Sequence, residues 1–262
     1  MKAVEGLRAE LDVPCRGAND NDADRFGGED TTGVLVPNYV LCVLFDHLCR
    51  TRGYTAAMGI GRTIGTTHLL DRIAADHGRP VHEVDVGFKW YVQGLVEGRY
   101  VLAGEESAGL SLPDRAGRVW VTEKDGIAAA LLFMELVAHT GLDVGSRYRE
   151  LEARHGVHHY ERVDLPATPD RKARLAALAA VPAEVERRLA GRRVAGRTVE
   201  RVRVGDGVKV VLDGGVWVLK RASGTEDIIK DYREERGDSL DTARRASVEL
   251  DALLGLADAE GA

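Results

Sequence analysis

The sequence predicts two successive domains: an α/β domain with a mixed, mainly parallel sheet, followed by an α+β domain with a small antiparallel sheet. Between residues 56 and 86, strand-like, helix-like and strand-like runs follow one another, which is the βαβ pattern of a parallel sheet. Between residues 202 and 219, short valine-rich runs are separated by glycine turns, which indicates antiparallel strands. The length of 262 residues accommodates two domains of this kind.

In the first domain, a largely buried helix is predicted from Pro37 to Gly53, with Asn38 as its N-cap, because apolar residues cover most of its surface. Asp125 is a second expected N-cap, and Gly141 the matching stop. The remaining predicted elements are a short helix through Val4, Leu7 and Leu11, strand 56–60, helix 66–77, strand 81–86, strand 100–103, helix 127–140 and helix 146–154.

Two glycine-containing segments of this domain are harder to assign. Residues 13–17 combine proline and glycine, so they predict a poor strand. Residues 59–65 resemble a dinucleotide-binding loop, but their third glycine comes one position too late. We therefore interpret 59–65 as a turn, with Arg62 as a minor candidate for a site.

In the second domain, Thr168 is the expected N-cap of a helix that has Pro169 at its first position. A C-terminal helix is predicted because Ala243, Ser247 and Leu250 share one face. The predicted elements are strand 160–165, the helix after Thr168, strands 202–204, 208–212 and 216–219, and helix 241–254. We expect the helices to pack on one side of the sheet.

The composition narrows the class of protein. There are 36 basic and 42 acidic residues, giving a net charge of −6, so we expect no nucleic-acid partner and no attraction to anionic membranes. No apolar run is long enough for a membrane span, and no secretory signal is expected. Three cysteines without paired spacing suit a reducing, cytoplasmic environment.

An acidic loop is the first candidate site. Asp20, Asp22 and Asp24 alternate along a turn-forming segment that ends at Arg25, and convergent carboxylates are ligands that Mg²⁺ and Ca²⁺ prefer. An EF-hand is excluded because Arg25 stands where glycine is required and Thr31 where glutamate is required. The alternative is a solvated acidic loop without an ion.

Two further loops and one lysine are candidates for ligand contacts. Residues 104–109 place two glutamates and a serine on a glycine-flanked turn, which suits sugar hydroxyls or is simply a solvated turn. Residues 220–226, with Lys230 nearby, combine cations, hydroxyls and a glycine, which favours phosphate binding over an ordinary polar turn. Lys89 either reaches a phosphate or lies along the surface.

Taken in order, these segments resemble bacterial phosphoglucomutases of the α-D-phosphohexomutase superfamily. The acidic loop is similar to that family's magnesium loop, residues 104–109 to its sugar-binding loop, and residues 221–227 to its phosphate-binding loop. Residues 86–90 and 123–126 resemble stretches of its glucose-phosphate-specific branch. The resemblance covers nearly the whole chain and implies that the chain corresponds to the C-terminal part of such an enzyme.

The resemblance implies a domain organisation and a reaction. Residues 1–30 would be a remnant of the second domain with the metal loop, 31–155 the third α/β domain, and 156–262 a domain with a fold like the TATA-binding protein. The family interconverts glucose 1-phosphate and glucose 6-phosphate through a phosphoserine and a bisphosphate intermediate. The implied roles are Asp20, Asp22 and Asp24 for Mg²⁺; Arg25 and Lys89 for catalysis; and Glu105, Ser107, Arg221, Ser223, Gly224, Thr225 and Lys230 for substrate binding.

The family's nucleophilic serine has no counterpart here, because none of the serines is followed by histidine and asparagine. The resemblance therefore implies an enzyme whose nucleophile-bearing domain is supplied by a separate N-terminal half or a longer parent protein. The alternative is a non-catalytic sugar-phosphate-binding fragment or pseudoenzyme.

Overall fold

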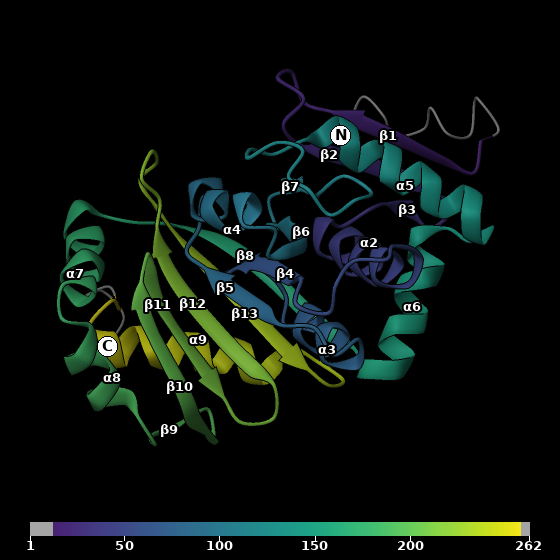
Figure 1. Cartoon of the computed structure of the whole chain (residues 1–262). Coiled ribbons are helices and arrows are strands. Elements are labelled where there is room, and N and C mark those ends of the chain that lie inside the picture. The colour runs from purple at the N-terminus through teal and green to yellow at the C-terminus, as the bar shows by residue number, and fades with distance from the viewer. Residues whose placement is uncertain (1–12, 258–262) are drawn as a thin grey trace. The chain divides into compact units, whose positions relative to one another are not determined.

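The fold comes from a computed structural model of the chain, which describes residues 13–257 (Figure 1). The chain divides into two compact units: the first ends at His155 and the second begins at Gly156. The helix predicted through Val4, Leu7 and Leu11 lies outside the described residues.

The first unit contains a mixed sheet with strand order β5-β4-β6-β7. Strand β4 pairs in parallel with β5 and β6, and β7 is antiparallel to β6, so the prediction of a mainly parallel sheet is confirmed. A separate antiparallel sheet has the order β1-β2-β3. The elements are β1 (Cys15–Asn19), β2 (Phe26–Asp30), β3 (Gly33–Val34), α2 (Pro37–Thr51), β4 (Gly59–Thr63), α3 (Leu69–Asp76), β5 (Val81–Val84), the 3₁₀ helix η1 (Phe88–Trp90), α4 (Val92–Val96), β6 (Tyr100–Gly104), β7 (Leu110–Ser111), α5 (Gly126–Thr140) and α6 (Val144–His155).

The prediction of a poor strand before the acidic loop is wrong. Strand β1 pairs with β2 over its whole length, from Cys15 opposite Asp30 to Asn19 opposite Phe26. A Cβ atom added at Gly17 would lie 3.2 Å from the Cβ of Ala130 in α5, so the glycine allows this helix to pack closely on the hairpin (Figure 1). The acidic loop is thus the connection of a β-hairpin that α5 supports.

The turn predicted over residues 59–65 is also wrong, because this segment supplies the central strand β4. A Cβ atom added at Gly59 would lie 1.9 Å from the carbonyl oxygen of Pro80, and one at Gly61 would lie 3.0 Å from the ring of Tyr91. The glycines are therefore needed where the backbone of Pro80 and the ring of Tyr91 approach the strand closely. Arg62 is buried in ion pairs.

Helix α2 is largely buried as predicted, but its predicted ends are wrong. Its N-cap is Val36, and the side chain of Asn38 instead accepts a hydrogen bond from the Thr67 amide at 3.4 Å. It ends at Thr51, two residues before Gly53. The caps of α5 are confirmed, because Asp125 accepts a hydrogen bond from the Ala128 amide and Gly141 adopts φ = 70°.

The second unit is an antiparallel sheet with strand order β8-β13-β12-β11-β10-β9. Its elements are β8 (His158–Pro166), α7 (Pro169–Ala179), α8 (Pro182–Leu189), β9 (Arg193–Val194), β10 (Arg197–Gly205), β11 (Gly207–Leu212), β12 (Val216–Ala222), β13 (Ile228–Arg236) and α9 (Asp241–Leu254). The C-terminal helix and the Thr168 N-cap are confirmed. Strands β9 and β13 and helix α8 were not predicted.

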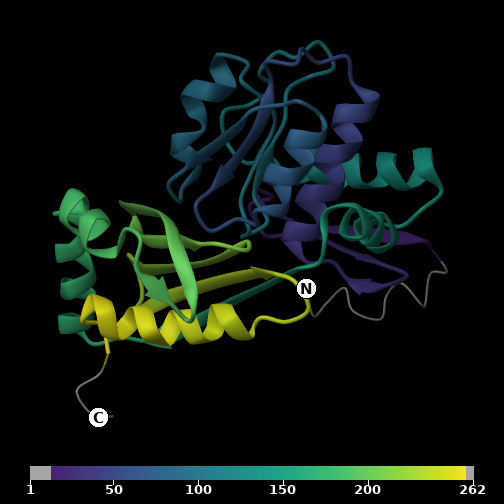
Figure 2. The ribbon, with the colours of Figure 1, turned by 90° about the horizontal axis from the view of Figure 1, so that it is seen from below.

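The core of the second unit lies on one face of its sheet. Alternate residues of the sheet, such as Val208, Val210 and Val218, pack with Leu175 of α7 and Leu250 of α9 in a single buried cluster. Figure 2 shows α9 running along the sheet. The predicted α+β arrangement, with helices on one side, is therefore confirmed. Among residues 13–257, no single helix is long and apolar enough to cross a membrane.

Candidate functional site

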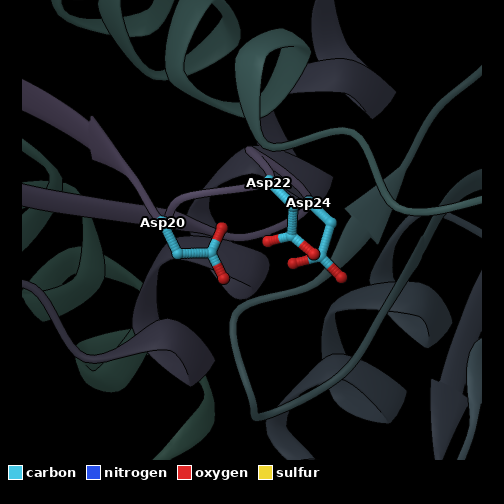
Figure 3. A group of neighbouring side chains, drawn as sticks. All are labelled: Asp20, Asp22 and Asp24. Carbon is cyan, nitrogen blue, oxygen red and sulfur yellow. The ribbon is translucent and has the colours of Figure 1, made fainter.

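The acidic loop brings the predicted carboxylates together. Ligand oxygens of Asp20, Asp22 and Asp24 all lie within 4.8 Å of one another, and Figure 3 shows the Asp20 carboxylate directed toward the other two. The turn is closed by a hydrogen bond of 3.0 Å from the Ala23 amide to the Asp20 carbonyl, with Ala23 at φ = 56°. A compact set of carboxylate oxygens fits a hard divalent cation such as Mg²⁺.

A lysine that was not predicted as a site residue contacts this loop. The Nζ atom of Lys124 lies 2.6 Å from Oδ2 of Asp24, and its side chain is only 16% exposed. The hydrogen bond from Lys124 holds the pKa of Asp24 below its usual range. Lys124 lies in one of the stretches that carry the family resemblance. Its pairing with Asp24 could not be predicted from a local pattern, because the two residues are 100 positions apart in the sequence.

Backbone contacts join the acidic loop to the segments around residues 108 and 126. The Phe26 amide donates to the Ala108 carbonyl at 3.0 Å, and the Gly126 amide donates to the Ala23 carbonyl at 3.0 Å. A Cβ atom at Gly126 would lie 2.4 Å from the carbonyl oxygen of Arg25, so this close approach requires glycine. Three predicted segments therefore form one continuous site within the first unit.

The predicted sugar-binding loop is partly buried rather than a solvated turn. Glu105 is 6% exposed, and its burial raises the pKa of its carboxyl group. The Ser107 hydroxyl donates to Oε1 of Glu105 at 2.7 Å, while the neighbouring Glu106 accepts a hydrogen bond from Thr63 at 3.0 Å. Glu106 thus anchors the loop to β4, and Glu105 and Ser107 form a paired group suited to sugar hydroxyls.

Arg25 and Lys89, the two residues predicted to be catalytic, have different surroundings. The Nε atom of Arg25 lies 3.8 Å from Asp24 and 4.0 Å from Asp20, and about half of its side chain is exposed. Lys89 belongs to η1, where its Nζ atom lies 5.1 Å from the centre of the Trp90 ring. Within the described part of the chain, no hydrogen bond or ion pair joins Lys89 to the acidic loop.

The predicted phosphate-binding loop connects β12 and β13 in the second unit. Arg221 donates from Nε to Asp206 at 2.6 Å, and Lys230 lies directly opposite Arg221 in the sheet register. A bound phosphate would therefore have to compete with Asp206 for this guanidinium. Asp206 belongs to a glycine-containing turn, and no local pattern in the sequence predicts its pairing with Arg221.

The other three predicted phosphate-binding residues of this loop comprise one buried and two exposed positions. Ser223 is 4% exposed, and its hydroxyl oxygen accepts a hydrogen bond from the Glu226 amide at 3.3 Å. Gly224 and Thr225 are exposed, and no atom lies within 4 Å of a Cβ added at Gly224. The loop thus leaves open space at the glycine, where a ligand can approach the backbone.

Comparisons with known proteins identify the family to which the chain is similar. Residues 36–155 match the family model for phosphoglucomutase/phosphomannomutase, alpha/beta/alpha domain III. A phosphoglucomutase of Komagataeibacter xylinus is 38% identical over 240 residues, which are 89% of this chain and 42% of that protein.

Solved structures show the same fold. A phosphoglucomutase/phosphomannomutase family protein from Burkholderia thailandensis is 21% identical, with a TM-score of 0.72 over 100% of this chain and 51% of that one. An N-acetylphosphoglucosamine mutase of Aspergillus fumigatus, solved with GlcNAc-6P and magnesium, is 16% identical, with a TM-score of 0.52 over 90% of this chain and 48% of that one. The chain spans about half the length of these relatives, or less. It belongs to the phosphohexomutase superfamily.

Proposed function

We propose that this chain supplies the metal, sugar and phosphate loops of a phosphoglucomutase that interconverts glucose 1-phosphate and glucose 6-phosphate. The observation that carries the proposal is the joined site of the first unit: the three aspartate carboxylates converge and Lys124 pairs with Asp24. Backbone hydrogen bonds connect this acidic loop to the loop that carries Glu105. The 38% identity to a phosphoglucomutase supports it. The loop 105–108 favours glucose over other hexoses by its resemblance to the glucose-specific branch.

The chain's own residues would bind and orient the substrate. Glu105 and Ser107 would accept hydrogen bonds from vicinal sugar hydroxyls, and the loop from Arg221 to Thr225, with Lys230, would hold the phosphate that is not reacting. The positive charges that would stabilise the reacting phosphate are those of Arg25, Lys124 and Lys89.

Asp20, Asp22 and Asp24 would hold Mg²⁺, because they offer a compact set of carboxylate oxygens. When bound, the ion would neutralise negative charge on the transferring phosphoryl group.

The phosphoserine would come from a polypeptide segment outside this sequence. No serine of the chain is followed by histidine and asparagine, the pattern that the family's nucleophile loop implies. The segment would belong either to a separate N-terminal half or to a longer parent protein.

The proposal is tested by two measurements on the full chain. Calorimetry with glucose 1-phosphate is expected to show binding, and adding a separately expressed N-terminal half is expected to produce conversion to glucose 6-phosphate. Binding without any gain in conversion would favour the alternative, a non-catalytic sugar-phosphate binder. Absence of binding at millimolar ligand would contradict both.

We expect the isolated chain to bind Mg²⁺ weakly, with a dissociation constant of roughly 10⁻⁴–10⁻³ M or above, because only three carboxylates converge and Lys124 already contacts one of them. Magnesium calorimetry measures this, and Asp24→Asn should weaken binding further. Asp164→Asn is the control, because that carboxylate is paired with Arg162 in the second unit. A low-micromolar constant for the unmodified chain would contradict the expectation.

A further inference from the structure

A lysine ammonium group is buried directly before the phosphate-binding loop. The side chain of Lys220 is 1% exposed, on the helix-covered face of β12. Its Nζ atom donates to Oδ2 of Asp231 at 3.0 Å, to Oγ of Ser247 at 2.7 Å and to Oδ2 of Asp251 at 3.0 Å. Burial of a charge is costly unless it is paired and hydrogen-bonded, and this charge has three partners.

The network crosses from the sheet to the C-terminal helix close to the loop. Lys220 lies opposite Asp231, and only two further residue pairs follow before the strands separate, the last being Ala222 opposite Ile229. Ser247 in α9 also donates to Oδ2 of Asp231 at 2.6 Å. The network therefore fastens both strands that carry the loop to the same helix.

Helix α7 extends the network to the far end of the loop. Arg171 lies 3.5 Å from Oδ2 of Asp251, which is a partner of Lys220. The next residue, Lys172, donates to the carbonyl oxygen of Glu226 at 2.8 Å and to Asp227 at 3.3 Å. The start and the end of the loop are thus held through adjacent residues of one helix.

We propose that Lys220 is a positioning residue that holds the loop 221–227 in the conformation that accepts phosphate. When a complete buried ion-pair network is replaced by apolar residues of similar volume, the folded protein is often equally or more stable. The network around Lys220 is therefore better explained by the loop geometry that it imposes than by its contribution to stability. The proposal deepens the proposed function, because it assigns to this loop the binding of a sugar phosphate.

The test compares Lys220→Met with the unmodified full chain by two measurements. Amide hydrogen exchange at Ser223 and Glu226, whose amides donate to the Ile228 carbonyl and to the Ser223 hydroxyl oxygen, is expected to become about tenfold faster. Calorimetry is expected to show glucose 1-phosphate binding weakened by about tenfold.

A matched control is available at the other end of the same strands. Glu235 is 8% exposed, lies opposite Val216, and accepts hydrogen bonds from the Thr242 and Ala243 amides at the start of α9. Glu235→Ala and Lys220→Met should both lower the urea midpoint of unfolding, because each removes one partner of a buried hydrogen-bonded group. Only Lys220→Met should change loop exchange and ligand affinity. A purely structural role of Lys220 would give the same result for both variants.

The outcomes separate the two proposals. Unchanged loop exchange in Lys220→Met overturns the positioning role, whether or not a ligand binds. Faster loop exchange in a chain whose unmodified form binds no glucose 1-phosphate supports positioning and contradicts the proposed function. If Lys220→Met does not fold, Ser247→Ala, which removes one bond of the network, should still increase loop exchange by about threefold, and no increase would overturn the proposal.

Discussion

Replacing Arg221 by alanine is expected to weaken the binding of glucose 1-phosphate by about tenfold to hundredfold, because hydrogen bonds to a charged group contribute about 1.5–3 kcal/mol. The unliganded guanidinium is bonded to Asp206 at 2.6 Å. Because that bond must break when phosphate binds, we expect a loss of affinity closer to tenfold than to hundredfold. Calorimetric titration with glucose 1-phosphate measures the effect.

The control for Arg221 is Arg162→Ala, which removes the same charge from β8 in the same unit. Arg162 is bonded to Asp164, so its loss tests the general effect of reducing positive charge. We expect less than a twofold change for this variant. Equal losses of affinity in the two variants would mean that general electrostatics, rather than a phosphate site at Arg221, determines binding.

The sequence predicted those parts of the site whose residues are close together in the chain. Asp20, Asp22 and Asp24 alternate within five residues, so one turn is sufficient to bring their carboxylates together. Lys124 and Asp206 reach their partners only through the folded arrangement of separate segments. Neither a local pattern nor composition distinguishes such residues from the other charged residues of the chain.

The same distinction applies to the fold. Helices α5 and α9 were predicted with nearly correct ends because caps and apolar spacing are local signals. The first strand of the βαβ unit is predicted three residues too early, at 56–60 instead of 59–63, because glycine is usually a turn residue. In the structure, Gly59 and Gly61 are required by the close approach of Pro80 and Tyr91. Strand β13 carries charged residues at most of its positions, so its sequence lacks the alternation of apolar and polar residues that predicts a strand. It forms because it pairs with β12 on one side and β8 on the other.

The second large effect is expected for Arg62→Leu, which should destabilise the first unit by about 3–5 kcal/mol. The Arg62 side chain is 1% exposed and donates to Asp71 at 2.5 and 2.7 Å and to Glu83 at 2.7 Å. These carboxylates hold the pKa of the guanidinium above its usual range despite its burial. Leucine would fill part of the space but leave the 10% exposed carboxylate of Glu83 without its guanidinium partner.

The measurement is amide hydrogen exchange in β4 and β6, which reports the free energy of opening of the sheet itself. Arg118→Leu is the matched control, because Arg118 is 78% exposed and pairs with Asp114 on the surface, where an ion pair contributes about 0–1 kcal/mol. Equal exchange rates in the two variants would show that burial of the Arg62 ion pairs does not stabilise the sheet. A large difference would explain why a charged residue occupies the centre of this strand: its guanidinium group links β4 to Asp71 in α3 and to Glu83 in β5.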